Sequence, residues 1–462
     1  MANSAPTAGT ATIGGHPKGL YLLFVTEMWE RMSYYGMRAL LVLYMVASTD
    51  KGGFGWDSAK ALQIYGLYTG LVYLTPLAGG FIADRFIGQR TAVTLGGVLM
   101  MIGHFLMAVP GVPAFYAALA FLIIGNGFFK PNISTMVGGL YEQGDARRDG
   151  AFTIFYMGIN LGAFMSPLVC GTLGEMFGWH YGFGAAGVGM GLGLVCFLAL
   201  HKKFLGNVGL APQKTSNRAT SVQQAPKAPL SKVEGQRVAV IFILAAFSMF
   251  FWAAFEQAGG LMNLYTDQKV DRVVGSFEVP TTWFQSVNPL IILLLAPVFA
   301  SLWVALGKKN RDPSSPVKFA VGLILLAGGF VMMMFASQQS EAVGKASLYW
   351  VLLAYLFHTM GELCLSPVGL SMVTKLAPQR MVSLMMGVWL LSSAGANYVA
   401  GWIGGLSAEL GEYQLFTSIV IATAFAGVVL LAFAKPLKRM MHGAEGGTEL
   451  QPEPAPAKPA IG

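Results

Sequence analysis

Several otherwise apolar stretches of this sequence contain ionisable side chains. The basic ones are Arg31, Arg38 and Lys130, and the acidic ones are Glu27, Glu30, Glu256 and Glu362. Each charge at the centre of a membrane span costs on the order of 3 kcal/mol in insertion, so such residues usually face a polar cavity and act on something there. The alternative is that they form structural ion pairs that lock helices together. Such locking accounts for isolated pairs, but poorly for charges with aromatic and amide neighbours.

The charged residues of the first apolar stretch are regularly spaced. Glu27, Arg31, Tyr34 and Arg38 follow one another at intervals of 4, 3 and 4 residues. At about 100° per residue, this spacing aligns them along one face of a helix. Glu27 and Arg31 stand in the i, i+4 order that favours an ion pair, and Glu30 flanks the stripe. A tyrosine beside the arginines can donate hydrogen bonds while it keeps the wall of a cavity largely apolar.

The two halves of the chain differ in the sign of these charges. The amino-terminal half contributes Arg31, Arg38 and Lys130, and the carboxy-terminal half contributes Glu256 and Glu362. A cavity between the halves would therefore be positive on one wall and negative on the other. Such a field suits a zwitterion, whose carboxylate an arginine can bind bidentately. We expect the ammonium group of that zwitterion to lie near Glu362.

The composition is that of a membrane protein. Of 462 residues, 55% are hydrophobic and 11% charged, against roughly 25% charged in ordinary soluble domains. The net charge of +8 does not indicate nucleic-acid binding, because the basic residues form short clusters between apolar runs. Cys170, Cys196 and Cys364 lie within apolar segments, without the spacing of metal ligands or of a disulfide framework. We expect an all-α, multi-pass protein of the lipid bilayer.

The apolar stretches are long enough to cross the membrane as helices, for which about 20 residues suffice. We predict twelve transmembrane helices in two six-helix bundles. The predicted spans lie near residues 20–47, 59–82, 91–109, 114–136, 152–176 and 180–201 in the first bundle, and near residues 238–266, 281–305, 317–337, 347–375, 381–407 and 414–434 in the second bundle.

Three polar segments frame the two predicted bundles, which comprise residues 17–201 and 238–436. Residues 202–237 are rich in Pro, Gln, Ser and Lys, so we expect a cytoplasmic linker that neither spans the membrane nor forms a core. The small and polar residues 1–16 predict a disordered amino terminus. Residues 437–462 predict a disordered cytoplasmic tail.

The orientation follows from the distribution of Lys and Arg, which favour the cytoplasmic side. Most of these residues fall in the linker, near the termini and in the loops on the same side of the membrane. The loops of the other side contain Lys51, Lys60, Lys269, Arg272 and Lys345. We therefore expect both termini in the cytoplasm and the protein in the cell membrane, or the inner membrane of a bacterium. This topology explains the positive charge without an anionic partner.

Motifs along the chain carry a family resemblance. Residues 27–35, with the sequence EMWERMSYY, resemble the ExxERFxYY signature of the proton-dependent oligopeptide transporters, a branch of the major facilitator superfamily. Residues 79–88 resemble the loop between the second and third spans of that family, and residues 155–162 resemble its fifth-span motif. Further matches in family order are Phe129-Lys130-Pro131-Asn132, Phe251-Trp252, Glu256-Gln257, Asn288-Pro289, Glu362 and Ser366-Pro367.

The resemblance implies proton-coupled symport of di- and tripeptides by alternating access on the major facilitator fold. It implies that protons are the coupling ion, that no cofactor or metal is needed, and that the monomer functions. It assigns proton coupling to Glu27, Glu30 and Arg31, and gate ion pairs to Arg38–Glu256 and Lys130–Glu362. The peptide-binding residues that it implies are Arg31, Tyr34, Tyr35, Arg38, Tyr73, Lys130, Asn160, Trp252, Asn288, Glu362, Ser366 and Trp389.

The sequence departs from the family pattern at several positions. Met32 replaces the usual Phe, and Gly259-Gly260 stands where many members have two serines. Gly66 stands where animal and some bacterial relatives have a histidine, so proton coupling cannot depend on that imidazole. Many bacterial members also have two extra helices between the bundles, for which residues 202–237 are too polar.

A different substrate or a plain packing role is compatible with some of these features. The same architecture could transport another small organic ion or a drug in a proton-coupled way, without needing opposite walls at Arg31 and Glu362. An enzyme is not expected, because neither an HExxH zinc motif nor a GxSxG nucleophile motif occurs. His358, four residues before Glu362, is expected to be a packing residue rather than a proton relay. Apart from the resemblance, Trp252 and Trp389 could equally serve ordinary packing.

Overall fold

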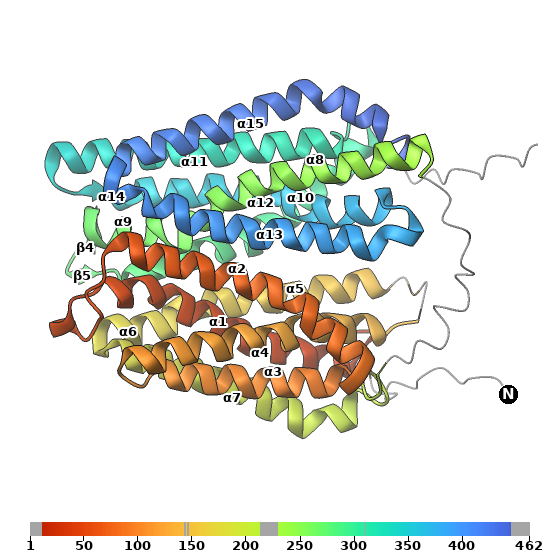
Figure 1. Ribbon diagram of the computed structural model, residues 1–462, viewed down its shortest axis with the longest axis horizontal. Coiled ribbons are helices and arrows are strands. Elements are labelled where there is room, and N and C mark those ends of the chain that lie inside the picture. The colour runs from red at the N-terminus through yellow and green to blue at the C-terminus, as the bar shows by residue number, and fades with distance from the viewer. Residues whose placement is uncertain (1–11, 143–144, 146, 213–229, 310, 445–462) are drawn as a thin grey trace, which may run out of the picture.

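The computed structural model describes residues 12–142, 145, 147–212, 230–309 and 311–444. Its helices lie roughly side by side in two groups, with residues 18–204 in one and residues 232–440 in the other (Figure 1). Ten helices within the described residues are long and apolar enough to cross a membrane. With α1, which is set apart by its charged residues, and α13, they form the predicted twelve spans. The prediction of an all-α major facilitator fold is thereby confirmed.

Within its described residues the first bundle contains seven α-helices, because one span is interrupted. They are α1 (Lys18–Val46), α2 (Ser58–Ile82), α3 (Gln89–Met107), α4 (Val112–Gly139), α5 (Arg147–Ser166), α6 (Thr172–Phe177) and α7 (Trp179–Phe204). Shorter helical segments are η1 (Thr49–Lys51), η2 (Ala83–Ile87) and η3 (Pro167–Gly171), of which η2 and η3 are π-helical. The η3 segment joins α5 to α6, so these three form one span.

The second bundle is likewise interrupted within one span. Its helices are α8 (Lys232–Phe255), α9 (Leu261–Lys269), α10 (Val287–Lys308), α11 (Ser315–Val343), α12 (Leu348–Leu376), α13 (Val382–Gly405), α14 (Ser407–Leu410) and α15 (Glu412–Met440). The 3-10 segments are η4 (Glu256–Gly259), η5 (Thr281–Ser286) and η6 (Gln379–Met381). Of these, η4 interrupts the span formed by α8 and α9, and η5 runs directly into α10.

In the part of the chain that the structure describes, six two-residue strands lie at the ends of the bundles. Strand β1 (Thr12–Ile13) pairs antiparallel with β2 (His16–Pro17), and β4 (Val273–Val274) pairs antiparallel with β5 (Phe277–Glu278). Strand β3 (Val270–Asp271) pairs parallel with β6 (Ala346–Ser347). We call the side where α1 and α8 start and α7 and α15 end the terminal face. The other side, which carries α9, α14, β4 and β5 (Figure 1), is the opposite face.

The predicted boundaries of the polar segments differ from the structure in four places. Strands β1 and β2 begin within residues 1–16, which were expected to be disordered, and α15 continues to Met440. Helix α7 continues to Phe204, inside the predicted linker, and the buried Leu205 and Val208 after it join the apolar core of the first bundle, contrary to the expectation. Helix α8 begins at Lys232, inside the predicted linker, because Ser231 and Glu234 form a capping box. The Glu234 amide donates to Ser231 Oγ at 3.1 Å, and the Ser231 amide donates to Glu234 Oε2 at 2.9 Å. The remaining parts of these predictions, residues 1–11, 213–229 and 445–462, lie outside the described residues.

Each bundle has its own apolar core. One cluster of buried side chains draws on α1 to α5 and α7, joined by Leu264 of α9, and a second cluster draws on α8, α9, α11, α12, α13 and α15. Two separate cores leave each bundle internally stable when the contact between the bundles changes. This organisation permits the bundles to move against one another as bodies.

Helices α2 and α13 bring the two bundles together through glycines. A Cβ on Gly66 of α2 would lie 2.6 Å from the Cα of Gly401 on α13, and 2.8 Å from its nitrogen. Small residues allow helix backbones to approach closely inside a membrane. The glycine at position 66 is therefore a packing requirement here, and a histidine at this position would collide with α13.

We expect Gly66→Ala to destabilise the protein, because the new methyl group meets backbone atoms that cannot rotate away. Overpacking of this kind costs about 1–3 kcal/mol. Gly387→Ala on α13 is the matched control, since a Cβ there would meet no atom within 4 Å. Thermal unfolding of the detergent-purified variants measures the difference. Equal melting temperatures for both variants would contradict tight contact at Gly66.

Candidate functional site

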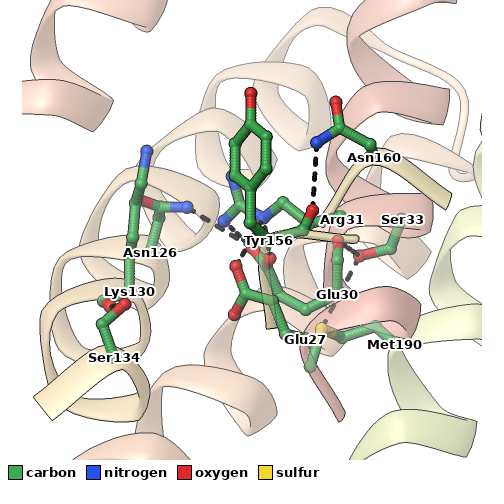
Figure 2. Close-up of polar contacts among 10 residues, drawn as sticks. All are labelled: Glu27, Glu30, Arg31, Ser33, Asn126, Lys130, Ser134, Tyr156, Asn160 and Met190. Carbon is green, nitrogen blue, oxygen red and sulfur yellow. Dashed lines mark hydrogen bonds and ion pairs between the residues drawn. The ribbon is translucent and has the colours of Figure 1, made fainter. Parts of the chain in front are cut away.

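The charged stripe of α1 forms an ion-pair cluster inside the first bundle. Arg31 Nη2 donates to Glu30 Oε1 at 2.7 Å, and Arg31 Nε contacts Glu30 Oε2 as well. Arg31 Nε also lies 3.2 Å from Glu27 Oε1, as the i, i+4 spacing predicts. Asn126 of α4 donates to Glu30 Oε1 at 3.5 Å (Figure 2). The guanidinium group is thus held by two carboxylates on the same helix.

This cluster is sealed from solvent. The exposed fractions of Glu27, Glu30 and Arg31 are 2%, 0% and 3%. Glu27 Oε2 is buried without a hydrogen-bond partner among the described residues. The cluster therefore holds two carboxylates against one guanidinium, with one carboxylate oxygen still free to bind a proton or a donor. Lys130 lies beside it on α4 (Figure 2).

A second ion pair joins the two bundles. Arg38 of α1 contacts Glu256, the first residue of η4, through its Nη2 atom. Arg38 Nε donates to the Tyr65 hydroxyl, and the guanidinium carbon lies 5.5 Å from the centre of that ring. A Cβ on Gly259 would overlap the Tyr65 hydroxyl. The absence of a side chain at Gly259 thus makes room for this arrangement, and the predicted Arg38–Glu256 ion pair is present.

A cavity of about 360 Å³ lies between the bundles next to this pair. Its volume is within the range of small-molecule sites, roughly 300–1,000 Å³. The predicted peptide-binding residues that line it are Tyr35, Arg38, Tyr73, Lys130, Asn160, Trp252, Asn288, Glu362 and Ser366. A smaller pocket of about 160 Å³ shares Tyr73, Trp252, Glu256 and Ser366 with it and adds Trp389. Residues from both bundles, far apart in the sequence, therefore meet at one site.

Arg31 and Tyr34 are the two predicted peptide-binding residues that do not line either pocket. Arg31 is held by its carboxylates, and its guanidinium carbon lies 5.2 Å from the centre of the Tyr34 ring and 5.9 Å from that of Tyr35. The Tyr34 hydroxyl is buried without a hydrogen-bond partner among the described residues. Arg31 thus lies next to both tyrosine rings and does not line the cavity in this conformation.

The predicted Lys130–Glu362 ion pair is not formed in this conformation, and its role as a gate stays a prediction. Within the described residues no ion pair joins these two side chains; Lys130 Nζ lies 4.4 Å from the centre of the Tyr73 ring instead. Glu362 Oε2 accepts a hydrogen bond from Asn288 Nδ2 at 2.9 Å. Both residues line the cavity. Lys130 contacts Tyr73 of the first bundle, and Glu362 contacts Asn288 of the second bundle. The positive and negative walls expected from the sequence are both present, but Lys130 and Glu362 do not contact each other across the cavity.

Amides and hydroxyls orient the side chains of the negative wall. Asn288 Nδ2 also donates to Thr359 Oγ1 at 3.0 Å, and Thr359 Oγ1 donates to the Tyr355 carbonyl at 2.7 Å. On the other wall, Asn160 Nδ2 donates to the Tyr156 carbonyl at 3.0 Å. Asn160 therefore uses one of its two N–H groups within its own helix.

Five further polar residues line these pockets and were missed by sequence reasoning: Tyr156, Gln285, Tyr355, Ser393 and Asn397. Helical spacing could have found three of them. Tyr156 precedes Asn160 by one turn, Ser393 follows Trp389 by one turn, and Tyr355 precedes Glu362 by two turns, so each lies on the same helix face as its partner. Gln285 and Asn397 have no comparable signal in the sequence.

His358 is packed within the second bundle. Its ring lies 4.6 Å from that of Phe330, and Gly329 of α11 leaves room for its Nε2 edge. Both ring nitrogens lack a hydrogen-bond partner among the described residues. The residue borders the cavity, but its Nε2 edge is directed toward α11. This geometry agrees with the expectation of a packing histidine.

Comparisons with known proteins agree with this geometry. The family model PTR2, described as the POT family, matches residues 90–209 and 201–416. The peptide transporter YePEPT of Yersinia enterocolitica is 38% identical, covering 96% of this chain and 99% of its own. A di-/tripeptide transporter of Lactococcus lactis is 33% identical, covering 93% and 97%. A peptide transporter solved in complex with alafosfalin is 39% identical, with a TM-score of 0.88 and coverage of 95% and 99%.

Proposed function

Because this chain belongs to the POT family, the proton-dependent oligopeptide transporters, we propose that it is a proton-coupled symporter that imports di- and tripeptides by alternating access. The observation that carries this proposal is the pair of opposite charges across one cavity. Lys130 of the first bundle and Glu362 of the second line the same space, and neither is paired with an opposite charge among the described residues. A zwitterion bound between them would satisfy both charges.

The bound peptide would lie across the interface between the bundles. Its carboxylate would meet Lys130 first, and its amino group would meet Glu362 and the Asn288 amide. Arg31 and Arg38 would join the carboxylate only after leaving their present partners. The peptide side chains would lie against tyrosines, tryptophans and apolar residues, which discriminate weakly between side chains. We therefore propose broad selectivity among short peptides.

Coupling to protons would arise at the α1 cluster. Glu27 and Glu30 together carry one more charge than Arg31 can balance, so a proton on either carboxylate completes the balance. Protonation would weaken the hold on Arg31 and free it for the substrate. Loss of that proton on the other side of the membrane would restore the ion pair and release the peptide.

The terminal face would be cytoplasmic, because most Lys and Arg lie there. The transporter would then act in the cell membrane as a monomer, with protons as the coupling ion and no cofactor. Each elementary charge that moves inward through 100 mV supplies about 2.3 kcal/mol, which is sufficient to concentrate a peptide severalfold.

We expect purified protein in liposomes to accumulate dialanine when the outside is more acidic than the inside. Without a gradient the peptide should only equilibrate. Radiolabelled dialanine uptake, measured with and without a proton ionophore, tests this coupling. Uptake that ignores the gradient would overturn it, and liposomes without protein are the control.

Competition distinguishes this proposal from transport of another small organic ion or a drug. A panel of di-, tri- and tetrapeptides should inhibit dialanine uptake in the order of fit, with tetrapeptides weakest. Failure of every peptide to compete would favour the other substrate class. Peptide incubated with the purified protein should be recovered uncleaved, as expected for a transporter without catalytic activity.

A further inference from the structure

A second set of bonds between the bundles lies near the opposite face, away from the cavity. Glu175 of α6 accepts hydrogen bonds from the Thr281 amide at 2.8 Å, the Thr282 amide at 2.9 Å and Thr282 Oγ1 at 2.6 Å. Both threonines belong to the second bundle, at the start of the continuous helical segment Thr281–Lys308. One carboxylate of the first bundle therefore caps a membrane-spanning helix of the second.

Further contacts around Glu175 show that the two bundles pack closely against each other there. Trp283 Nε1 donates to Thr172 Oγ1 at 2.8 Å, and Ser286 Oγ donates to the Phe164 carbonyl at 2.8 Å. A Cβ on Gly171 would overlap Thr282 Oγ1. The π-helical segment η3, which ends at Gly171, lies at the centre of this contact.

Among the described residues that form these bridges, Glu175 is the charged group, and the amides and hydroxyl that donate to it offset part of the cost of burying its charge. The first amides of a helix have no acceptor within the helix, and the helix dipole is positive there. Hydrogen bonds to a charged group are stronger than neutral ones. Separating the bundles at the opposite face would break all three bonds to Glu175 together and leave the Thr281 and Thr282 amides to water.

We infer that Glu175 is a positioning residue for transport, whose cap on Thr281 and Thr282 sets how readily the bundles separate at the opposite face. This role is distinct from that of Arg38–Glu256, which lies beside the cavity. The cap can form only in the state in which the bundles meet at the opposite face. It stabilises that state independently of which substrate is transported. Its consequence for uptake rests on the proposed function.

Spin-label distances across the opposite face measure this equilibrium directly. Labels at Asp50→Cys and Ser276→Cys report on the two bundles, because both positions are exposed and lie on different bundles. Cys196, the one native cysteine that is not buried, is replaced by Ser. The full-length protein in lipid nanodiscs is compared without substrate, so the result does not depend on peptide transport.

Glu175→Ala should shift the population toward longer distances by about tenfold to a hundredfold, from the loss of hydrogen bonds to a charged group. Glu175→Gln should give a smaller shift, since its carbonyl oxygen still accepts a hydrogen bond. Gly171→Ala should act in the same direction, by forcing Thr282 away. Glu278→Gln is the matched control: its carboxylate pairs with Arg272 in its own bundle and should leave the distances unchanged.

Uptake provides a readout that a purely structural role would not move. A larger fraction open at the opposite face lowers the apparent KM for external dialanine, because affinity scales with the population competent to bind. The maximal rate should fall at the same time, since closure becomes slower. Unchanged distances in Glu175→Gln and Gly171→Ala would overturn the inference even if Glu175→Ala failed to fold. Changed distances with no dialanine transport by any variant would instead count against the proposed function alone.

Discussion

Glu30→Gln should abolish the accumulation of dialanine driven by a pH gradient, while exchange of labelled for unlabelled peptide continues. Glu30 holds Arg31 with both carboxylate oxygens and is fully buried. The amide of Gln has one acceptor oxygen and no charge, so it holds the guanidinium as a permanently protonated carboxyl group would. Arg31 then remains available to the peptide, but no proton can drive the cycle. Accumulation should fall to the equilibrium level, which is the largest change that this assay can register.

Glu27→Gln should likewise abolish gradient-driven accumulation while exchange continues, and it should disturb Arg31 less. Only one Glu27 oxygen contacts Arg31, at 3.2 Å, and the other has no partner among the described residues. Its replacement therefore disturbs fewer bonds. Glu341→Gln, an exposed carboxylate on α11, controls for the loss of a negative charge and should transport like the original protein. Equal loss of gradient-driven uptake and exchange in both α1 variants would contradict a coupling role and indicate a role in binding or folding.

The helices themselves were predictable, because their positions depend on properties of short stretches of sequence, namely apolar length and the spacing of charged residues. Apolar length predicts each span, and the intervals between Glu27, Arg31 and Arg38 predict one charged helix face. The Glu27–Arg31 ion pair follows from the same spacing. The capping box that starts α8 at Lys232 was also visible, as Ser231 followed three residues later by Glu234. It was missed because the polar composition of residues 202–237 suggested a linker throughout.

The contacts between the bundles were less predictable, because they depend on how the two bundles are placed relative to each other in three dimensions. The sign of each wall could be inferred from Lys130 and Glu362, but not whether the two charges meet. The cap formed by Glu175 on Thr281 and Thr282 joins residues more than a hundred positions apart. No periodicity connects them. Gly66 is another example, because the need for a glycine at this position follows only from its close contact with Gly401 in the folded protein.

Glu362→Gln should raise the KM for dialanine by about tenfold to a hundredfold, because a hydrogen bond to a charged group contributes roughly 1.5–3 kcal/mol. N-acetyl-dialanine has no ammonium group, so its weaker uptake should scarcely change. Lys130→Gln should give the mirror result: a large loss for dialanine and little change for dialanine amide, which has no carboxylate. Exchange without a pH gradient measures both, since it is independent of proton coupling. Glu409→Gln on α14 and Lys435→Gln on α15 remove exposed charges and serve as matched controls.

The double variant separates binding of the peptide ends from a direct bond between the two residues. If Lys130 and Glu362 act on opposite ends of the peptide, their effects on KM should add to within about 0.5 kcal/mol, as for independent sites. If they pair with each other during the cycle, removing either one leaves the other uncompensated, and the second substitution then costs little. Strong coupling would therefore favour the gate ion pair that the family resemblance implies. Additivity would assign both residues to the substrate, in agreement with their separation across the cavity and with the partner that each has on its own wall.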